Sequence, residues 1–89
     1  MEDILRELRD FNRRLRLGYE LTDEERERYS QFFDCALEFI EKIDNDYAVM
    51  CLSERYINRK KWPEIAEGLG LYSVDAVRKY ASRAVKKYS

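Results

Sequence analysis

The residues best suited to chemistry lie near the carboxyl end of the chain, where basic side chains recur at helical spacing. The segment from Ser73 to Ser89 holds five basic residues and one acidic residue, a net charge of +4. At 100° per residue its polar side chains gather on one helix face: Asp75, Lys79, Ser82, Arg83 and Lys86, with Arg78 and Tyr80 at the flanks. The opposite face is apolar: Val74, Val77, Ala81, Ala84 and Tyr88. Guanidinium and ammonium groups on an exposed helix face can bind phosphates and donate to guanine edges, so the pattern predicts a helix that binds DNA.

The sequence offers no comparable set of residues for catalysis. It contains no histidine, which removes the commonest general base and every nucleophile pair that depends on one. It has no glycine motif that binds phosphate. Cys35 and Cys51 stand alone in apolar, helix-patterned segments, so we interpret both as small buried hydrophobic residues without a disulfide. We therefore expect no enzymatic activity, no metal site and no cofactor.

Length and composition are typical of one small globular unit. The 89 residues are 45% hydrophobic and 39% charged, which excludes a disordered chain, since such chains lack apolar residues. No apolar run approaches the roughly 18–20 residues that cross a bilayer. We expect an intracellular protein without a membrane partner.

A short helix and a tight turn precede the basic segment. The predicted helix runs from about Trp62 to Leu69 and admits Pro63, because the first turn of a helix needs no amide donor there. The next four residues form the turn, and Ser73, the last of them, caps a helix that continues to about Tyr88. A short helix, a turn with glycine and a longer basic helix are the pattern of a helix-turn-helix unit, whose second helix enters the major groove.

Three further helices are predicted upstream, and no segment has the pattern of a strand. The first ends at Gly18, a candidate left-handed cap, after four apolar residues at helical spacing: Ile4, Leu8, Phe11 and Leu15. The second begins with a capping box at Thr22 and Glu25 and carries a wide apolar stripe: Tyr29, Phe32, Phe33, Ala36, Phe39, Ile40 and Ile43. The third runs from about Tyr47 to Ile57 and is apolar on most sides. The predicted fold class is therefore all-α, a small helical bundle of about five helices with these tyrosines in its core: Tyr29, Tyr47, Tyr56 and Tyr88.

The two halves of the chain differ in charge. Residues 1–46 carry a net charge of −6 and residues 47–89 a net charge of +5. Such asymmetry indicates two kinds of surface contact, although solvated helix faces would produce it as well. We divide the chain into amino-terminal amphipathic helices, 1–44, which complete the core or contact a partner, and a helix-turn-helix segment, 45–89.

Several short motifs in the second half resemble a known family. They are Glu64-Ile-Ala, Leu69-Gly70, Val77-Arg78 and the closing Arg83-Ala84-Val85-Lys86-Lys87, preceded by Arg55-Tyr56 at the end of the third helix. Together they resemble region 4 of bacterial sigma factors, over about residues 46–89. The turn from Gly70 to Val77 is one residue longer than the usual sigma pattern. With Tyr72-Ser73, this longer turn resembles phage-encoded late-gene regulators of Gram-positive bacteria, the ArpU/RinA kind. Nothing resembles the regions with which a complete sigma factor melts promoter DNA.

The resemblance implies a role for each matching position. The base-reading sites of the family fall on Val74, Asp75, Arg78 and Lys79. An arginine or lysine there donates to guanine, an aspartate accepts from cytosine N4, and Val74 can give at most an apolar contact to a thymine methyl group. Phosphate contacts are expected at Lys60, Lys61, Ser73, Ser82, Arg83, Lys86 and Lys87. The implied setting is the cytoplasm of a bacterial host cell.

The surroundings of two aromatic side chains can be interpreted in more than one way. Trp62 is expected to pack, partly buried, on the start of its helix; the alternative is a contact with the DNA backbone through its indole N–H. Tyr80 is the tyrosine that we expect to face DNA or a partner.

The leading hypothesis is a transcriptional regulator that binds double-stranded DNA sequence-specifically, of phage or prophage origin. One recognition helix binds weakly by itself, so we expect a homodimer through residues 1–43, with RNA polymerase as a possible further partner. A second hypothesis is a sigma-like protein-interaction module that binds RNA polymerase or another regulator. A third is a DNA-binding phage packaging protein of the small-terminase kind.

Overall fold

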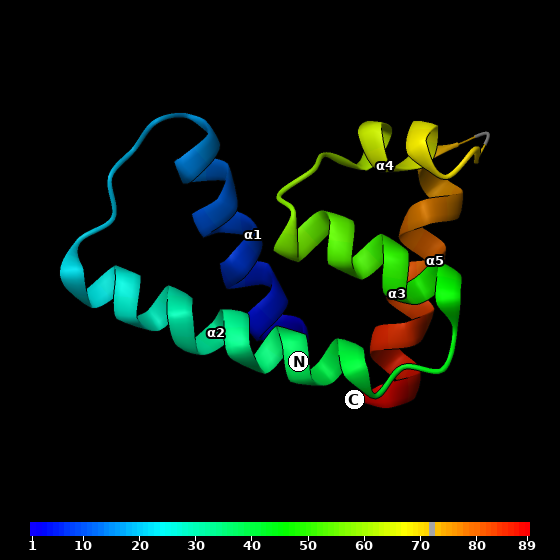
Figure 1. Ribbon diagram of the computed structural model, residues 1–89, viewed down its shortest axis with the longest axis horizontal. Coiled ribbons are helices and arrows are strands. Elements are labelled where there is room, and N and C mark those ends of the chain that lie inside the picture. The colour runs from blue at the N-terminus through cyan, green and yellow to red at the C-terminus, as the bar shows by residue number, and fades with distance from the viewer. Residues whose placement is uncertain (72) are drawn as a thin grey trace.

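Five α-helices and one π-helical segment make up the described part of the chain. The computed structural model describes residues 1–71 and 73–89. The elements, in chain order, are α1 (Glu2–Arg16), α2 (Asp23–Glu41), α3 (Asp46–Leu52), η1 (Ser53–Ile57), α4 (Trp62–Gly68) and α5 (Val74–Tyr88) (Figure 1). The described residues form no strand, so the prediction of an all-α bundle is confirmed.

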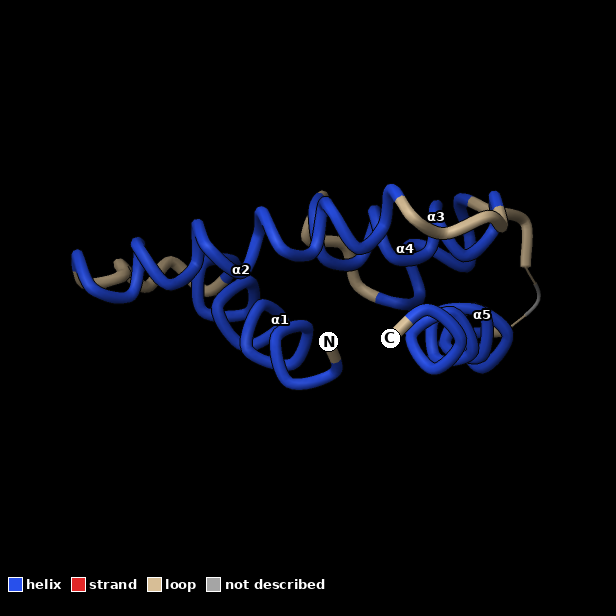
Figure 2. The backbone as a smooth tube through the Cα atoms, turned by 90° about the horizontal axis from the view of Figure 1, so that it is seen from below, coloured by secondary structure: helices blue, strands red, loops and turns tan. Residues whose placement is uncertain are grey.

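The helices are arranged in two layers. In Figure 2, α1 and α5 lie on the same side of the layer that contains α2 and α3. Figure 1 shows that α1 and α5 lie at different places along this layer and not against each other. The principal extents are 38 × 26 × 16 Å, and the smallest matches two helix layers, since helix axes pack 8–10 Å apart. The packed pairs join α1 to α2 and η1, and α5 to α3 and α4.

A single hydrophobic core holds both halves of the chain together. Leu8 of α1, Cys51 and Leu52 of α3 and Val77 of α5 are fully buried in it. Ala36, Phe39 and Ile40 of α2 belong to the same cluster, as does Ile43, which follows that helix. The amino-terminal helices therefore complete the core on which α4 and α5 pack.

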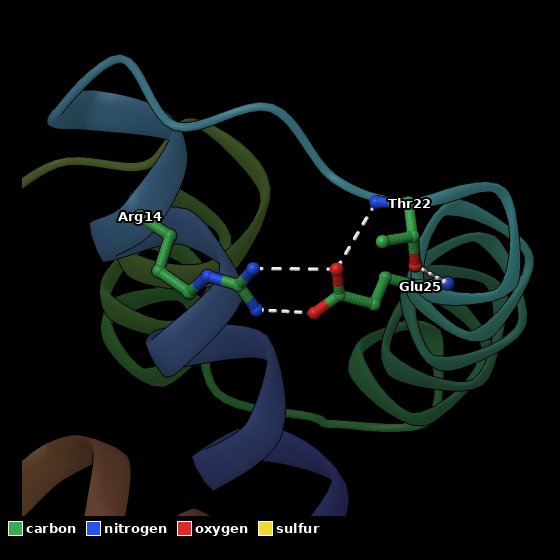
Figure 3. A network of polar contacts seen from close by, with 3 residues as sticks. All are labelled: Arg14, Thr22 and Glu25. Atoms are coloured by element: carbon green, nitrogen blue, oxygen red, sulfur yellow. Dashed lines mark hydrogen bonds and ion pairs between the residues drawn. The ribbon is translucent and has the colours of Figure 1, made fainter.

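Hydrogen bonds at the turn between α1 and α2 match the predicted caps. Gly18 has φ +86°, and the amide of Tyr19 donates to the carbonyl of Arg14 at 3.0 Å, a Schellman cap. The Thr22 hydroxyl accepts from the amide of Glu25 at 3.2 Å, and the Glu25 carboxylate accepts from the amide of Thr22 at 3.0 Å. The guanidinium of Arg14 forms a two-pronged ion pair with the same carboxylate (Figure 3). Glu25 thus caps α2 and ties it to α1.

One buried polar side chain links three elements. Asn12 is 2% exposed; its amide nitrogen donates to the carbonyl of Tyr56 at 3.1 Å and its oxygen accepts from the hydroxyl of Tyr29 at 2.9 Å. The Tyr56 carbonyl belongs to η1, where the hydrogen-bond spacing widens, as in the bond from the amide of Asn58 to the carbonyl of Ser53. The predicted third helix is therefore present in extent, but its second half is π-helical.

Some predictions about burial are wrong. Cys35 is exposed, because α2 is covered on one side only, whereas Cys51 is buried and both thiols are free. Tyr47 is 47% exposed and stacks on Tyr80 with ring centroids 5.4 Å apart, instead of lying in the core. The other three tyrosines of that prediction are half-buried at the edge of the core: Tyr29, Tyr56 and Tyr88.

Candidate nucleic-acid interface

Two caps, at Gly70 and Ser73, mark the end of α4 and the start of the basic helix α5. Gly70 has φ +68°, and the amide of Leu71 donates to the carbonyl of Ala66 at 2.9 Å, a second Schellman cap. Only a residue without a Cβ adopts this conformation at no steric cost. The hydroxyl of Ser73 accepts from the amide of Ala76 at 3.3 Å and caps α5, as predicted. Tyr72, which belongs to the longer turn that resembles the phage regulators, lies outside the described residues.

The two faces of α5 are divided as the sequence predicts. The core contains Val77, Ala81 and Ala84, together with Val85, which the periodicity did not include. The polar residues of the opposite face are all exposed: Asp75, Arg78, Lys79, Ser82, Arg83, Lys86 and Lys87. Val74, the remaining predicted base-reading residue, is half-buried. The helix therefore presents a continuous basic surface to solvent while its apolar side holds it to the bundle.

This basic surface forms one wall of a groove of about 470 Å³. The polar side chains that α5 contributes are Asp75, Arg78, Lys79 and Ser82. The opposite wall is α1, which contributes Glu2, Arg6 and Arg9. The floor is largely apolar: Leu5, Leu52, Tyr56 and Trp62. Three of the four predicted base-reading residues thus line a groove shared with the amino-terminal half.

A guanidinium stacks on the tryptophan that lines the groove. Arg55 lies over the ring of Trp62 at 4.8 Å and donates to the carbonyl of Lys60 at 3.2 Å. Burial lowers the pKa of Arg55, and the charges of Arg9 and Arg78, together with that of Arg16, lower it further. Trp62 is half-buried and packs against the core, as expected, although it also lines the groove.

The far side of α5 holds two more of the predicted phosphate contacts, and a third lies close to α1. Arg83 and Lys87 line a smaller recess of about 170 Å³ with Tyr80, next to the connection between α2 and α3. Tyr80 is half-buried against the core. Lys86 lies near the amino terminus of α1. The basic residues of α5 therefore flank the helix on both sides.

The two lysines before α4 differ in their surroundings. Lys60 forms an ion pair with Glu54, which raises the pKa of the lysine and lowers that of the carboxylate. Glu54 also accepts from the side-chain Nδ2 of Asn58 at 2.6 Å. A phosphate contact by Lys60 requires that it leave this pair, whereas Lys61 is exposed and lies in none of the ion pairs of the described residues.

The sequence pattern did not indicate Arg6 and Arg9 as members of this surface. Along α1 the arginines alternate with Glu2, Glu7 and Asp10, so local charge gives no signal. Only the fold places the first two arginines opposite α5. Within residues 1–71 and 73–89 there is no group of three histidine, cysteine or acidic side chains that could hold a metal ion, and no helix long and apolar enough to cross a membrane.

The geometry thus presents a basic helix on a two-helix unit, with a second basic wall beside it. Comparison with protein-family models, with curated proteins and with solved structures finds no match to this chain.

Proposed function

We propose that this protein is a non-enzymatic transcriptional regulator that binds double-stranded DNA sequence-specifically through α5. The observation that carries the proposal is the division of α5 into a buried apolar face and an exposed face with five basic residues. A helix of 15 residues is about 22 Å long and, with its side chains, fits the major groove, which is about 12 Å wide. The caps that end α4 and begin α5 support the same proposal, because they delimit a short helix followed by a longer basic one.

The first two turns of α5 supply the base contacts in this proposal. Arg78 and Lys79 donate to guanine O6 and N7, and Asp75 accepts from cytosine N4. Val74 gives at most an apolar contact, and because it is half-buried, less of its side chain is accessible to a base. Arg83 and Lys87 on one side of the helix, with Ser82 on the other, contact phosphates and position the helix without reading sequence.

The resemblance to sigma region 4 and to phage late-gene regulators supports the biological setting. We propose a phage or prophage origin and action in the cytoplasm of a bacterial host, as a homodimer and with RNA polymerase as a further partner. A dimer doubles the contacted DNA, which one recognition helix requires for useful affinity.

The test is a binding titration on two duplexes. One is selected by the protein from a random-sequence library, and the other is its scrambled version. Fluorescence anisotropy at low and moderate salt should show preference for the selected duplex, and that preference should survive the higher salt, because base contacts release few counterions. Equal, salt-sensitive binding to both would reject sequence-specific recognition.

The second candidate function is a module that binds RNA polymerase or another regulator through protein contacts. Tyr47 and Met50 of α3, each 47% exposed, favour this candidate because they offer apolar area away from the groove. Co-purification with polymerase after nuclease treatment, abolished by Met50→Ser, would support it over direct DNA binding.

A further inference from the structure

The groove between α1 and α5 has a second basic wall that the resemblance to sigma region 4 does not assign. Arg6 and Arg9 of α1 face the same space as Arg78 and Lys79 of α5. Both helices project from one side of the molecule (Figure 2), so their exposed edges are open to the same large partner.

Positive charge in this groove is only partly neutralised within the described residues. Arg6 lies 3.7 Å from Asp3 and Arg9 lies 3.5 Å from Asp10, and these pairs are exposed and therefore weak. Arg78 takes part in none of the ion pairs formed by residues 1–71 and 73–89. Glu2 and Asp75 line the groove as well, but its cations outnumber them. An anion in the groove would relieve the repulsion among these guanidinium groups.

The geometry of DNA supplies such an anion. A helix with its side chains is 10–12 Å across and fills a major groove of about 12 Å, so a phosphate backbone runs along each side of it. On one side of α5 this backbone would pass Arg83 and Lys87. On the other side it would enter the space between α5 and α1.

We infer that α1 is the second wall of the DNA-binding surface, and that Arg6 and Arg9 contact phosphates of the strand that lies between α1 and α5. This inference rests on the proposed function, because it requires α5 to occupy the major groove. It also assigns DNA contacts to the acidic half of the chain, in which the net charge of −6 gave no indication of them.

The test compares two double variants with the same change in net charge. Arg6→Gln with Arg9→Gln alters the groove wall, whereas Arg26→Gln with Arg28→Gln alters exposed arginines of α2 that do not line the groove. Each variant is titrated against the selected duplex over 50–200 mM salt, after circular dichroism has shown an unchanged helix content.

The groove variant should bind about tenfold more weakly at 0.1 M salt, and the slope of log K against log salt should fall by about 2, because two phosphate contacts are lost. The α2 variant should keep the slope of the unmodified protein. Arg6→Lys with Arg9→Lys should restore most of the slope, because lysine keeps the charge.

The outcomes separate this inference from the proposed function. If the unmodified protein binds DNA and the groove variant keeps its slope, α1 is not part of the surface and the function stands. If both double variants lose slope equally, the effect is one of net charge and the inference is overturned. If the unmodified protein binds neither duplex, the proposed function fails and the inference with it.

Discussion

At the scale of single residues, the proposed DNA complex gives Arg78 a base contact and Lys86 a phosphate contact. Both are exposed on α5, but Arg78 lies in its second turn beside the groove and Lys86 near its end. Arg78→Ala should weaken binding to the selected duplex by about 1–3 kcal/mol and leave the scrambled duplex almost unchanged. Lys86→Ala should weaken both by the same factor and lower the salt slope by about 1. Anisotropy titrations measure these effects, and equal losses on both duplexes for Arg78→Ala would contradict its base-reading role.

Asn12 is a residue on which stability depends. Asn12→Leu keeps the number and branching of the side-chain heavy atoms but leaves the carbonyl of Tyr56 and the hydroxyl of Tyr29 without their partner. We expect a loss of about 1–3 kcal/mol in the free energy of unfolding, measured by urea denaturation. Tyr29→Phe removes one of the two bonds and should cost less, about 0.5–1.5 kcal/mol. A larger loss for Tyr29→Phe than for Asn12→Leu would show that the network does not centre on Asn12.

At the scale of elements, the joint between α1 and α2 depends on pH. The hydrogen bond from Arg14 and the capping contacts of Thr22 lower the pKa of Glu25 from 4.5 to about 2. Because the pKa is lower in the folded state, the stabilisation is complete above about pH 5 and is lost as the pH falls toward 2. Glu25→Gln should lower Tm at pH 7, and its difference from the unmodified protein should disappear near pH 2.

The control for that prediction is Glu24→Gln in the same helical turn. Glu24 is exposed and makes none of the contacts that lower the pKa of Glu25. Thermal unfolding followed by circular dichroism at pH 7, 4 and 2 should therefore show a smaller pH-dependent change for Glu24→Gln. The same change in both variants would indicate a general effect of charge at the start of α2.

Local signals in the sequence predict the ends of the helices well. The features that they do not predict, such as the burial of Asn12, depend on contacts between residues far apart in the chain. Gly18, Thr22 and Ser73 act within a few residues of their own positions, so their caps follow from local pattern. Asn12 is buried because the carbonyl of Tyr56, 44 residues away, accepts its hydrogen bond. Periodicity carries no information about such a partner.

At the scale of the whole molecule, the net charge of a stretch of sequence does not indicate the charge of the surface to which it contributes. The sequence predicts the basic face of α5 correctly, because that face lies within one helix. The groove could not be predicted, because it needs α1 and α5 to be placed on the same side of the bundle. Cys35 illustrates the same limit, since a helical pattern does not indicate how many neighbours cover a helix.

For the whole molecule we expect a homodimer. Leu17 and Tyr19, at the turn between α1 and α2, are 66% and 61% exposed, and a homodimer through residues 1–43 would cover such apolar area. Sedimentation equilibrium at tens of micromolar should give twice the 10.8 kDa of one chain. Leu17→Ser with Tyr19→Ser should shift the mass toward the monomer. A monomer mass for the unmodified protein would reject the dimer.

Trp62 gives the molecule an intrinsic fluorescent probe. It is the single tryptophan of the chain, it lines the groove, and the guanidinium of Arg55 stacks on its ring. Indole emission responds to local polarity and to nearby charge, so an occupant that displaces water or draws Arg55 away will change its intensity and wavelength. Unlabelled protein can therefore report by its own fluorescence when the groove fills, independently of any dye attached to DNA.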